Sequence, residues 1–163
     1  MIRRTIELSN GFKAKFNEEQ NVYELKVPWL GREIDIWLSS GDYEDAAEMD
    51  CLTKAFERFW TEKQDLLRMA QDDIKDKLIP YITEHESPMK FLPYPKVTRD
   101  DFDAEYWLTS VYIVAMTDFY NDVKFNFNRF DDENHYEELS VNRDVDSGYI
   151  SFDAGLNPVD IKE

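Results

Sequence analysis

The stretch EIDIWLSSGDYEDAAEMDCLTKAFERFW, residues 33–60, contains the change of hydrophobic period that decides the fold. In its first part Ile34, Ile36 and Leu38 occupy every second position, which is the period of a half-buried β-strand. In its second part apolar residues recur at three- and four-residue spacing, which is the period of an amphipathic helix. They are Met49, Leu52, Phe56 and Phe59. We therefore expect a strand that is followed along the chain by a helix.

The period of two also marks six other segments of the chain. Two precede this stretch and four follow it: residues 12–16, 23–27, 108–116, 123–130, 137–143 and 149–153. Because strands are followed by helices and then by strands again, the predicted class is α+β. We expect an antiparallel β-sheet with amphipathic helices packed on one face, in the order β-β-β-α-α-β-β-β-β. The length and the 42% apolar content predict a single globular domain over residues 1–163.

The helical pattern continues beyond residue 60. A second apolar stripe comprises Leu66, Met69 or Ala70, Ile74, Leu78 and Ile82. We expect Ser40-Gly41-Asp42 to cap the N-terminus of the helix. Pro80 has no amide proton and should kink or end the helix near Ile79. Cys51 is expected to be a buried, unreactive thiol. The side chains that we expect to be buried against the sheet are Phe56, Phe59, Leu66 and Ile74.

A short helix is predicted over residues 99–105, after a proline-containing connector, residues 86–97. Thr98 is the expected N-cap and Asp101 the N3 residue of a capping box. Val97 and Phe102 should pack on each other as a hydrophobic staple.

The chain carries 35 acidic and 19 basic residues, a net charge of −16. The excess is concentrated in residues 99–163, where 16 acidic residues stand against 5 basic ones. Such a field repels nucleic-acid phosphates and anionic lipid, and it accelerates association with basic proteins. We therefore expect no nucleic-acid or membrane partner and favour a basic protein partner. Acidic charge that only keeps the protein soluble is the alternative.

The sequence contains no motif that would hold a cofactor. It has no Gly-rich phosphate loop, no clustered Cys/His zinc pattern and no Gly-x-Ser-x-Gly nucleophile elbow, so we predict no cofactor. The N-terminal residues lack the apolar run of a signal peptide, and no apolar run approaches the roughly 18 residues of a membrane span. The expected location is the cytoplasm.

The densest polar segment is the acidic loop, residues 131–138, which contains five carboxylates and one imidazole. These groups suit a divalent cation, so the alternative function is a metal-dependent enzyme that uses Asp131, Asp132, Glu133 and His135. The segment lies between two predicted strands, however, where an exposed polar loop is expected in any case. We favour the loop, with no bound metal and no catalytic residue.

The favoured function is a non-catalytic protein-binding module. Tyr and Trp are preferred interface anchors, and Tyr106-Trp107 follows the predicted short helix directly. Packing of these rings in the core is the alternative. The residues predicted to contact a partner are Asp100, Asp101, Asp103, Glu105, Trp107, Asp131, Asp132, Glu133 and His135.

Several segments of the second half share features with a known family. They are Val97-Thr98-Arg99-Asp100-Asp101-Phe102, a strand near residues 109–114, Val123-Lys124-Phe125-Asn126-Phe127, Asp131-Asp132 and Ala154-Gly155, with helices around Leu66, Leu67 and Leu78. Over roughly residues 30–155 the chain resembles the uncharacterised bacterial family of unknown function numbered 2262. Where that family has Trp-Gly-His after the acidic loop, this chain has Asn134-His135-Tyr136. The resemblance implies the fold and a bacterial origin, but no activity.

Small acidic bacterial domains of this general kind include immunity proteins that neutralise secreted toxins. By that analogy, the sharpest form of the predicted function is an immunity-like inhibitor of a basic toxin or nuclease.

Overall fold

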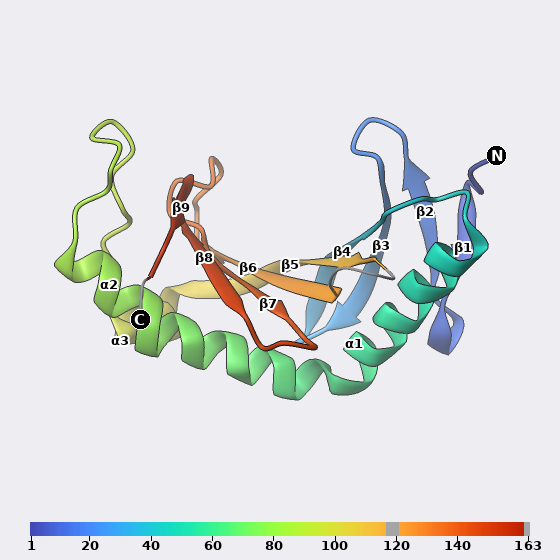
Figure 1. Ribbon diagram of the computed structural model, residues 1–163. Helices are drawn as coiled ribbons and strands as arrows, with labels where there is room; N and C mark the ends of the chain where they lie inside the picture. Colours follow the sequence, from blue (N-terminus) through green and yellow to red (C-terminus); the bar gives the residue numbers. More distant parts are fainter. Residues whose placement is uncertain (117–120, 162–163) are drawn as a thin grey trace. The chain divides into compact units, whose positions relative to one another are not determined.

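The computed structural model describes residues 1–116 and 121–161, which form a nine-stranded sheet and a long helical segment (Figure 1). The strands follow one another across the sheet in the order of the sequence. They are β1 (Thr5–Glu7), β2 (Lys13–Asn17), β3 (Val22–Trp29), β4 (Arg32–Ser40), β5 (Tyr106–Ala115), β6 (Asn121–Arg129), β7 (Leu139–Asp144), β8 (Ile150–Ala154) and β9 (Asn157–Val159). The helices are α1 (Ala46–Asp73), α2 (Ile79–Glu84) and α3 (Arg99–Glu105). The predicted α+β class is confirmed.

The sheet is mostly antiparallel, but β4 and β5 pair in parallel. A parallel pair needs a long crossover connection, which the helices supply. Each of the seven predicted segments forms a strand. The described residues contain two further strands, β1 and β9, which lie at the edges of the sheet and are three residues long. Three residues are too few for a period of two to be recognised in the sequence.

The chain forms two compact units. Unit 1 comprises Met1–Lys63, Ser110–Lys124 and Asp144–Tyr149. Unit 2 comprises Gln64–Thr109, Phe125–Arg143 and Ile150–Glu163. Neither unit is a continuous piece of the chain, and α1, β5, β6 and β7 each contribute residues to both.

The sheet side of the unit 1 core comes from alternate residues of β4 and β5. Ile36 and Leu38 are fully buried, and in the parallel ladder they stand beside Val111 and Ile113, which are also fully buried. These side chains share one face because successive residues of a strand point to opposite faces. The alternation in the sequence is thus an alternation of burial in the structure.

The helix side of the same core is aromatic. Phe56 and Phe59 of α1 are fully buried, as the helical spacing predicts. Phe12 meets Phe56 edge-on with ring centroids 5.9 Å apart, and Trp29 meets Phe59 in the same way at 5.9 Å. Such pairs contribute about 0.5–1.5 kcal/mol each beyond the burial of their area.

The expected N-cap of this helix is wrong. Ser40 ends β4, and α1 begins only at Ala46. The carboxylate of Asp45 accepts a hydrogen bond from the amide of Ala47 at 2.8 Å, and its carbonyl accepts from the amide of Met49 at 3.0 Å. Asp45 therefore occupies the capping position, because a short acidic side chain there satisfies an amide that the first turn leaves unpaired.

Cys51 is half-buried rather than fully buried. Burial, together with the nearby carboxylates of Glu48 and Asp50, raises the pKa of its thiol. The thiol therefore stays protonated near neutral pH, which makes it a poor nucleophile.

The second apolar stripe, in unit 2, differs from the prediction by one residue. Leu66 is only half-buried, whereas Leu67, Ala70 and Ile74 are buried. The helix is uninterrupted from Phe59, and one residue corresponds to about 100° of rotation. Leu67, Ala70 and Ile74 follow one another at spacings of three and four residues and form the buried stripe of unit 2, whereas Leu66 lies about 100° to one side of Leu67.

Pro80 does not end the helix. A π-helical turn, Ile74–Leu78, comes before it, and the amide of Ile79 donates to the carbonyl of Ile74. A wider turn relieves the contact between the proline ring and the carbonyl four residues earlier. The helix then continues as α2 to Glu84.

The short helix α3 spans the predicted residues. Thr98 and Asp101 form the capping box with both of its hydrogen bonds, 3.0 Å and 3.1 Å long. Phe102 is buried, and its ring meets that of Phe127 on β6 at 5.3 Å. This contact places the C-terminal end of α3 beside the end of β6.

Candidate functional site

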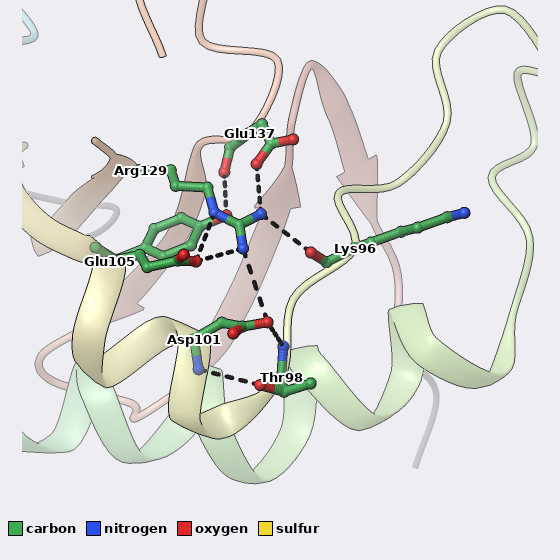
Figure 2. Close-up of polar contacts among 7 residues, drawn as sticks. Lys96, Thr98, Asp101, Glu105, Arg129 and Glu137 are labelled. Atoms are coloured by element: carbon green, nitrogen blue, oxygen red, sulfur yellow. Dashed lines mark hydrogen bonds and ion pairs between the residues drawn. The ribbon is translucent and has the colours of Figure 1, made fainter. Parts of the chain in front are cut away.

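Arg129, the last residue of β6, lies at the centre of a polar cluster in unit 2 (Figure 2). Its Nε and Nη2 donate to Oε2 of Glu105 at 3.0 and 2.5 Å. Its Nη1 donates to Oε2 of Glu137 at 2.6 Å and to the carbonyl of Lys96 at 3.0 Å. Nη2 also lies 3.7 Å from Oδ2 of Asp101. One guanidinium thereby joins α3, the connector and the acidic loop to the end of β6.

The two groups of the cluster that can lose a proton, Arg129 and Tyr106, both have raised pKa values. The hydrogen bond to Glu137, with that to Glu105, raises the pKa of the Arg129 guanidinium against the opposing effect of burial. Burial also raises the pKa of Tyr106, whose hydroxyl donates to the carbonyl of Glu137 at 2.8 Å. Neither group is suited to proton transfer near neutral pH. The geometry indicates a structural clamp that fixes the acidic loop.

Two further hydrogen bonds, both from backbone amides, fix the conformation of the acidic loop. Oδ2 of Asp132 accepts from the amide of Glu137 at 2.8 Å, and the carbonyl of Glu138 accepts from the amide of Gly155 at 2.6 Å. Gly155 has a φ of +62°, and a Cβ atom there would lie 2.5 Å from the carbonyl oxygen of Tyr136. Only glycine fits this contact, so the β8–β9 turn can approach the loop closely.

His135 takes part in a chain of side-chain hydrogen bonds. Its Nδ1 lies 2.8 Å from Oε2 of Glu138 and 3.0 Å from the amide group of Asn128. The same amide group lies 2.6 Å from Oγ1 of Thr109. Because a carboxylate only accepts hydrogen bonds, Nδ1 of His135 carries the proton in its contact with Glu138, while Oδ1 of Asn128 accepts from the Thr109 hydroxyl. The chain fixes the ring orientation and does not place a base against the Thr109 hydroxyl.

Trp107 and Phe130 form an aromatic pair at the surface of unit 2. Their ring centroids are 4.4 Å apart, and they are 38% and 45% exposed. The amide of Phe130 donates to the carbonyl of Glu105 at 2.9 Å, which holds the end of β6 against the end of α3. Tyr106, the neighbour of Trp107, is buried, since adjacent residues of a strand point to opposite faces. Two large, partly exposed rings in contact are typical of an interface anchor.

Four of the predicted acidic residues are engaged within the protein. Asp101 caps α3, and Glu105 bonds to Arg129. Asp103 pairs with Lys75 at 3.2 Å, and Asp132 accepts a backbone hydrogen bond in the acidic loop. These four stabilise the fold locally and are less available to a partner.

Three other predicted residues, Asp100, Asp131 and Glu133, are exposed. Their carboxylates have no hydrogen-bond or ion-pair partner within residues 1–116 and 121–161. Asp131 directly follows Phe130, so two of the three carboxylates, Asp131 and Glu133, lie within three residues of one ring of the aromatic pair in the sequence. Within the predicted set, these groups and Trp107 remain accessible for contact.

The residues of the metal-dependent alternative are not brought together. In the described part of the chain, no group of three or more His, Cys, Asp or Glu side chains is arranged to hold a metal ion. Asp132 directs its carboxylate to a backbone amide, and His135 is bonded to Glu138. Neither Asp131 nor Glu133 joins Asp132 and His135 in a set of metal ligands.

Two hollows flank the segment Pro93–Lys96, which lines both. The first, of 910 Å³, lies between α2, the connector and the start of α3. The second, of 640 Å³, is bounded on its other sides by Phe91, Tyr136 and Leu156. Figure 2 shows the carbonyl of Lys96 facing Arg129 and its side chain extending away from the guanidinium. The clamp thus fixes the backbone of the wall between the hollows.

No pattern in the sequence pointed to Arg129, Phe130 or the residues of the hollows as functional. Arg129 is an isolated cation directly before a run of acidic residues, and this isolation was the available signal. Phe130 was assigned to a strand, and nothing in the sequence showed that its ring meets Trp107. Phe91 and Leu156 are far apart in the chain, so their proximity follows only from the fold.

Comparison of the sequence with protein-family models and with curated proteins, and of the structure with solved structures, found no match. The resemblance to the bacterial family therefore stays a prediction. Across residues 1–116 and 121–161, no helix has both the length and the apolar character that crossing a membrane requires.

Proposed function

We propose that this protein is a non-catalytic binding module for a basic protein, and that its contact surface is centred on Trp107 and Phe130. The observation that carries this proposal is the partly exposed aromatic pair, of which Phe130 is followed in the chain by Asp131 and Glu133. Aromatic anchors with a polar, charged rim are typical of protein interfaces. The unpartnered carboxylates and the net charge of −16 favour a partner of positive charge.

In its sharpest form, the proposal is that the partner is a basic toxin or nuclease whose activity the module inhibits. Carboxylates held on an ordered loop could cover a cationic surface that otherwise binds phosphates. The Arg129 clamp supports this, because a fixed loop loses little conformational freedom when it binds.

The test begins with capture of the partner from the host, using the wild-type protein and a Trp107→Ala variant as bait. Binding of the captured protein is then followed by stopped-flow at two ionic strengths. Reversal of Asp131 and Glu133 to Lys should slow association, and the wild-type association rate should fall as salt rises. Reversal of Glu18 and Glu19, which lie in the exposed β2–β3 turn of unit 1, changes the net charge equally and is the matched control.

The Trp107→Ala variant should instead dissociate faster, since it removes a packed anchor and no charge. Equal effects of the two charge reversals would mean that only total charge matters and that no surface around Trp107 is involved. An acidic partner, or an association rate that is indifferent to salt, would contradict the proposal.

A further inference from the structure

The second hollow, beside Pro93–Lys96, is apolar and accessible. Its rim carries Phe91, Tyr136 and Leu156, which are 81%, 55% and 51% exposed. Its volume of 640 Å³ is within the range of pockets that hold ligands or the side chains of a bound segment. Three large apolar side chains that remain this exposed around one hollow indicate a surface that another molecule covers.

The lining of this hollow contains one ammonium that has no partner, although the protein as a whole is acidic. Its two charged lining residues are Lys96 and Glu137. The carboxylate of Glu137 is already paired with Arg129 at 2.6 Å, a guanidinium that it shares with Glu105. The ammonium of Lys96 has no hydrogen-bond or ion-pair partner among the described residues, and it extends away from the clamp that holds its backbone (Figure 2). The hollow therefore presents one unpaired ammonium beside an apolar surface.

The neutral polar groups around the hollow divide into two kinds. The amide of Asn157 is already used, because it donates to the carbonyl of Leu92 at 2.9 Å and accepts from the hydroxyl of Ser87 at 3.3 Å. The hydroxyls of Tyr94 and Tyr136 have no hydrogen-bond partner in the described part of the chain. Two hydroxyls beside an ammonium can donate to the carbonyls of an extended peptide and to one carboxylate.

We infer that the second hollow binds an extended peptide segment of a partner protein, with an apolar side chain in the hollow and an adjacent carboxylate on Lys96. A single carboxylate matches the single unpaired ammonium. The net charge of −16 disfavours polyanions such as nucleic acid or an anionic lipid surface. This site is separate from the surface around Trp107, and the inference does not depend on the proposed function.

The first hollow gives no comparable charge preference. Its lining contains three basic residues, Lys90, Lys96 and Arg99, and three acidic ones, Glu84, Glu86 and Asp101. The carboxylates of Glu84 and Glu86 have no ion-pair partner among the described residues, so a ligand of either sign meets both attraction and repulsion. Of the two hollows, we expect only the second to prefer a carboxylate.

The inference is tested with blocked tetrapeptides titrated into the ¹⁵N-labelled full chain. One peptide has a glutamate next to a phenylalanine, and a second has lysine in place of that glutamate. The glutamate peptide should shift the amide signals of residues 91–96, 136 and 156, and it should bind about fivefold more tightly than the lysine peptide. Equal binding of both peptides, or no shifts at millimolar concentration, would overturn the inference.

Two exposed variants and one control locate the site. Lys96→Gln should abolish the preference for glutamate, while Phe91→Ala should weaken binding of both peptides. Lys13→Gln, on β2 of unit 1, should change neither. Retention of the preference in Lys96→Gln would reject the role of this ammonium. If phenylacetate bound as tightly as the glutamate peptide, the hollow would be a small-molecule site and the peptide assignment would be wrong.

Discussion

Replacement of Arg129 by Gln should destabilise the protein well beyond the usual effect of losing a surface ion pair. The guanidinium makes four hydrogen bonds, two to Glu105, one to Glu137 and one to the carbonyl of Lys96. Bonds to charged groups are worth about 1.5–3 kcal/mol each, but bonds that share one side chain do not add. The carboxylates of Glu105 and Glu137 are 45% and 39% exposed, so water recovers part of the loss.

We therefore expect a loss of about 2–4 kcal/mol in the free energy of unfolding. For a chain of this size, that loss lowers the melting temperature by roughly 5–12 °C. The measurement is urea denaturation followed by circular dichroism, with the m-value compared between variants. Arg129→Lys should recover only a minor part of the loss, because one ammonium cannot reproduce a planar fork that bonds in three directions.

Arg58→Gln is the matched control. Arg58 pairs with Glu62 and Asp146 in unit 1, but its side chain is 43% exposed, against 21% for Arg129. Its loss should cost about 1 kcal/mol or less. If the two arginine variants were equally stable, the reasoning that the Arg129 clamp organises unit 2 would be refuted. Adding Glu105→Gln to Arg129→Gln should restore some stability, because it removes repulsion between the carboxylates left behind.

Three further changes test other parts of the structure. Phe56→Ala should cost about 3–5 kcal/mol in a urea melt, whereas Leu66→Ala should cost about 1 kcal/mol, and equal costs would mean that the core face of α1 is misplaced. Gly155→Ala should cost about 2–4 kcal/mol because it adds a clash to a left-handed φ, while Gly148→Ala, with a φ of +80° and open space around it, should cost about 1 kcal/mol. Burial raises the pKa of Tyr106 above its ordinary value of 10.0, so the folded state favours the neutral phenol more than the unfolded state does. The neutral phenol therefore contributes fully to stability below about pH 10, and this contribution is lost as the pH rises above 10. Tyr106→Phe should therefore reduce the alkaline loss of stability in melts between about pH 9 and 11, and an unchanged slope would contradict the assignment.

Much of the fold could be predicted because the signals are local. Ile34 to Leu38 alternate in the sequence as they alternate in burial, and the capping box of Thr98 and Asp101 is encoded within four residues. The wrong predictions concern the N-cap and the buried stripe of α1, where neighbouring residues of the same type compete for one position. Asp42 and Asp45 are both plausible caps, and Leu66 and Leu67 are adjacent leucines of which only the packing within unit 2 decides which one is buried.

The candidate site was less predictable because its parts meet only in three dimensions. Sequence composition indicated the acidic loop and Trp107, but it could not show that Glu105 and Glu137 share one arginine. It also treated the acidic residues as equivalent. The structure separates those that stabilise the protein, such as Asp132, from those that remain exposed, such as Asp131.

The parallel ladder between β4 and β5 constrains the order in which the protein can form during synthesis. Asp35 pairs with Ser110, so all three helices must leave the ribosome before that ladder can close. The hairpins among β1–β4 need only local contacts and can form early, whereas closing the longer loop is slower. Until β5 emerges, β4 is an unprotected sheet edge carrying Ile36 and Leu38, and the nascent chain is then most exposed to pairing with the wrong strand.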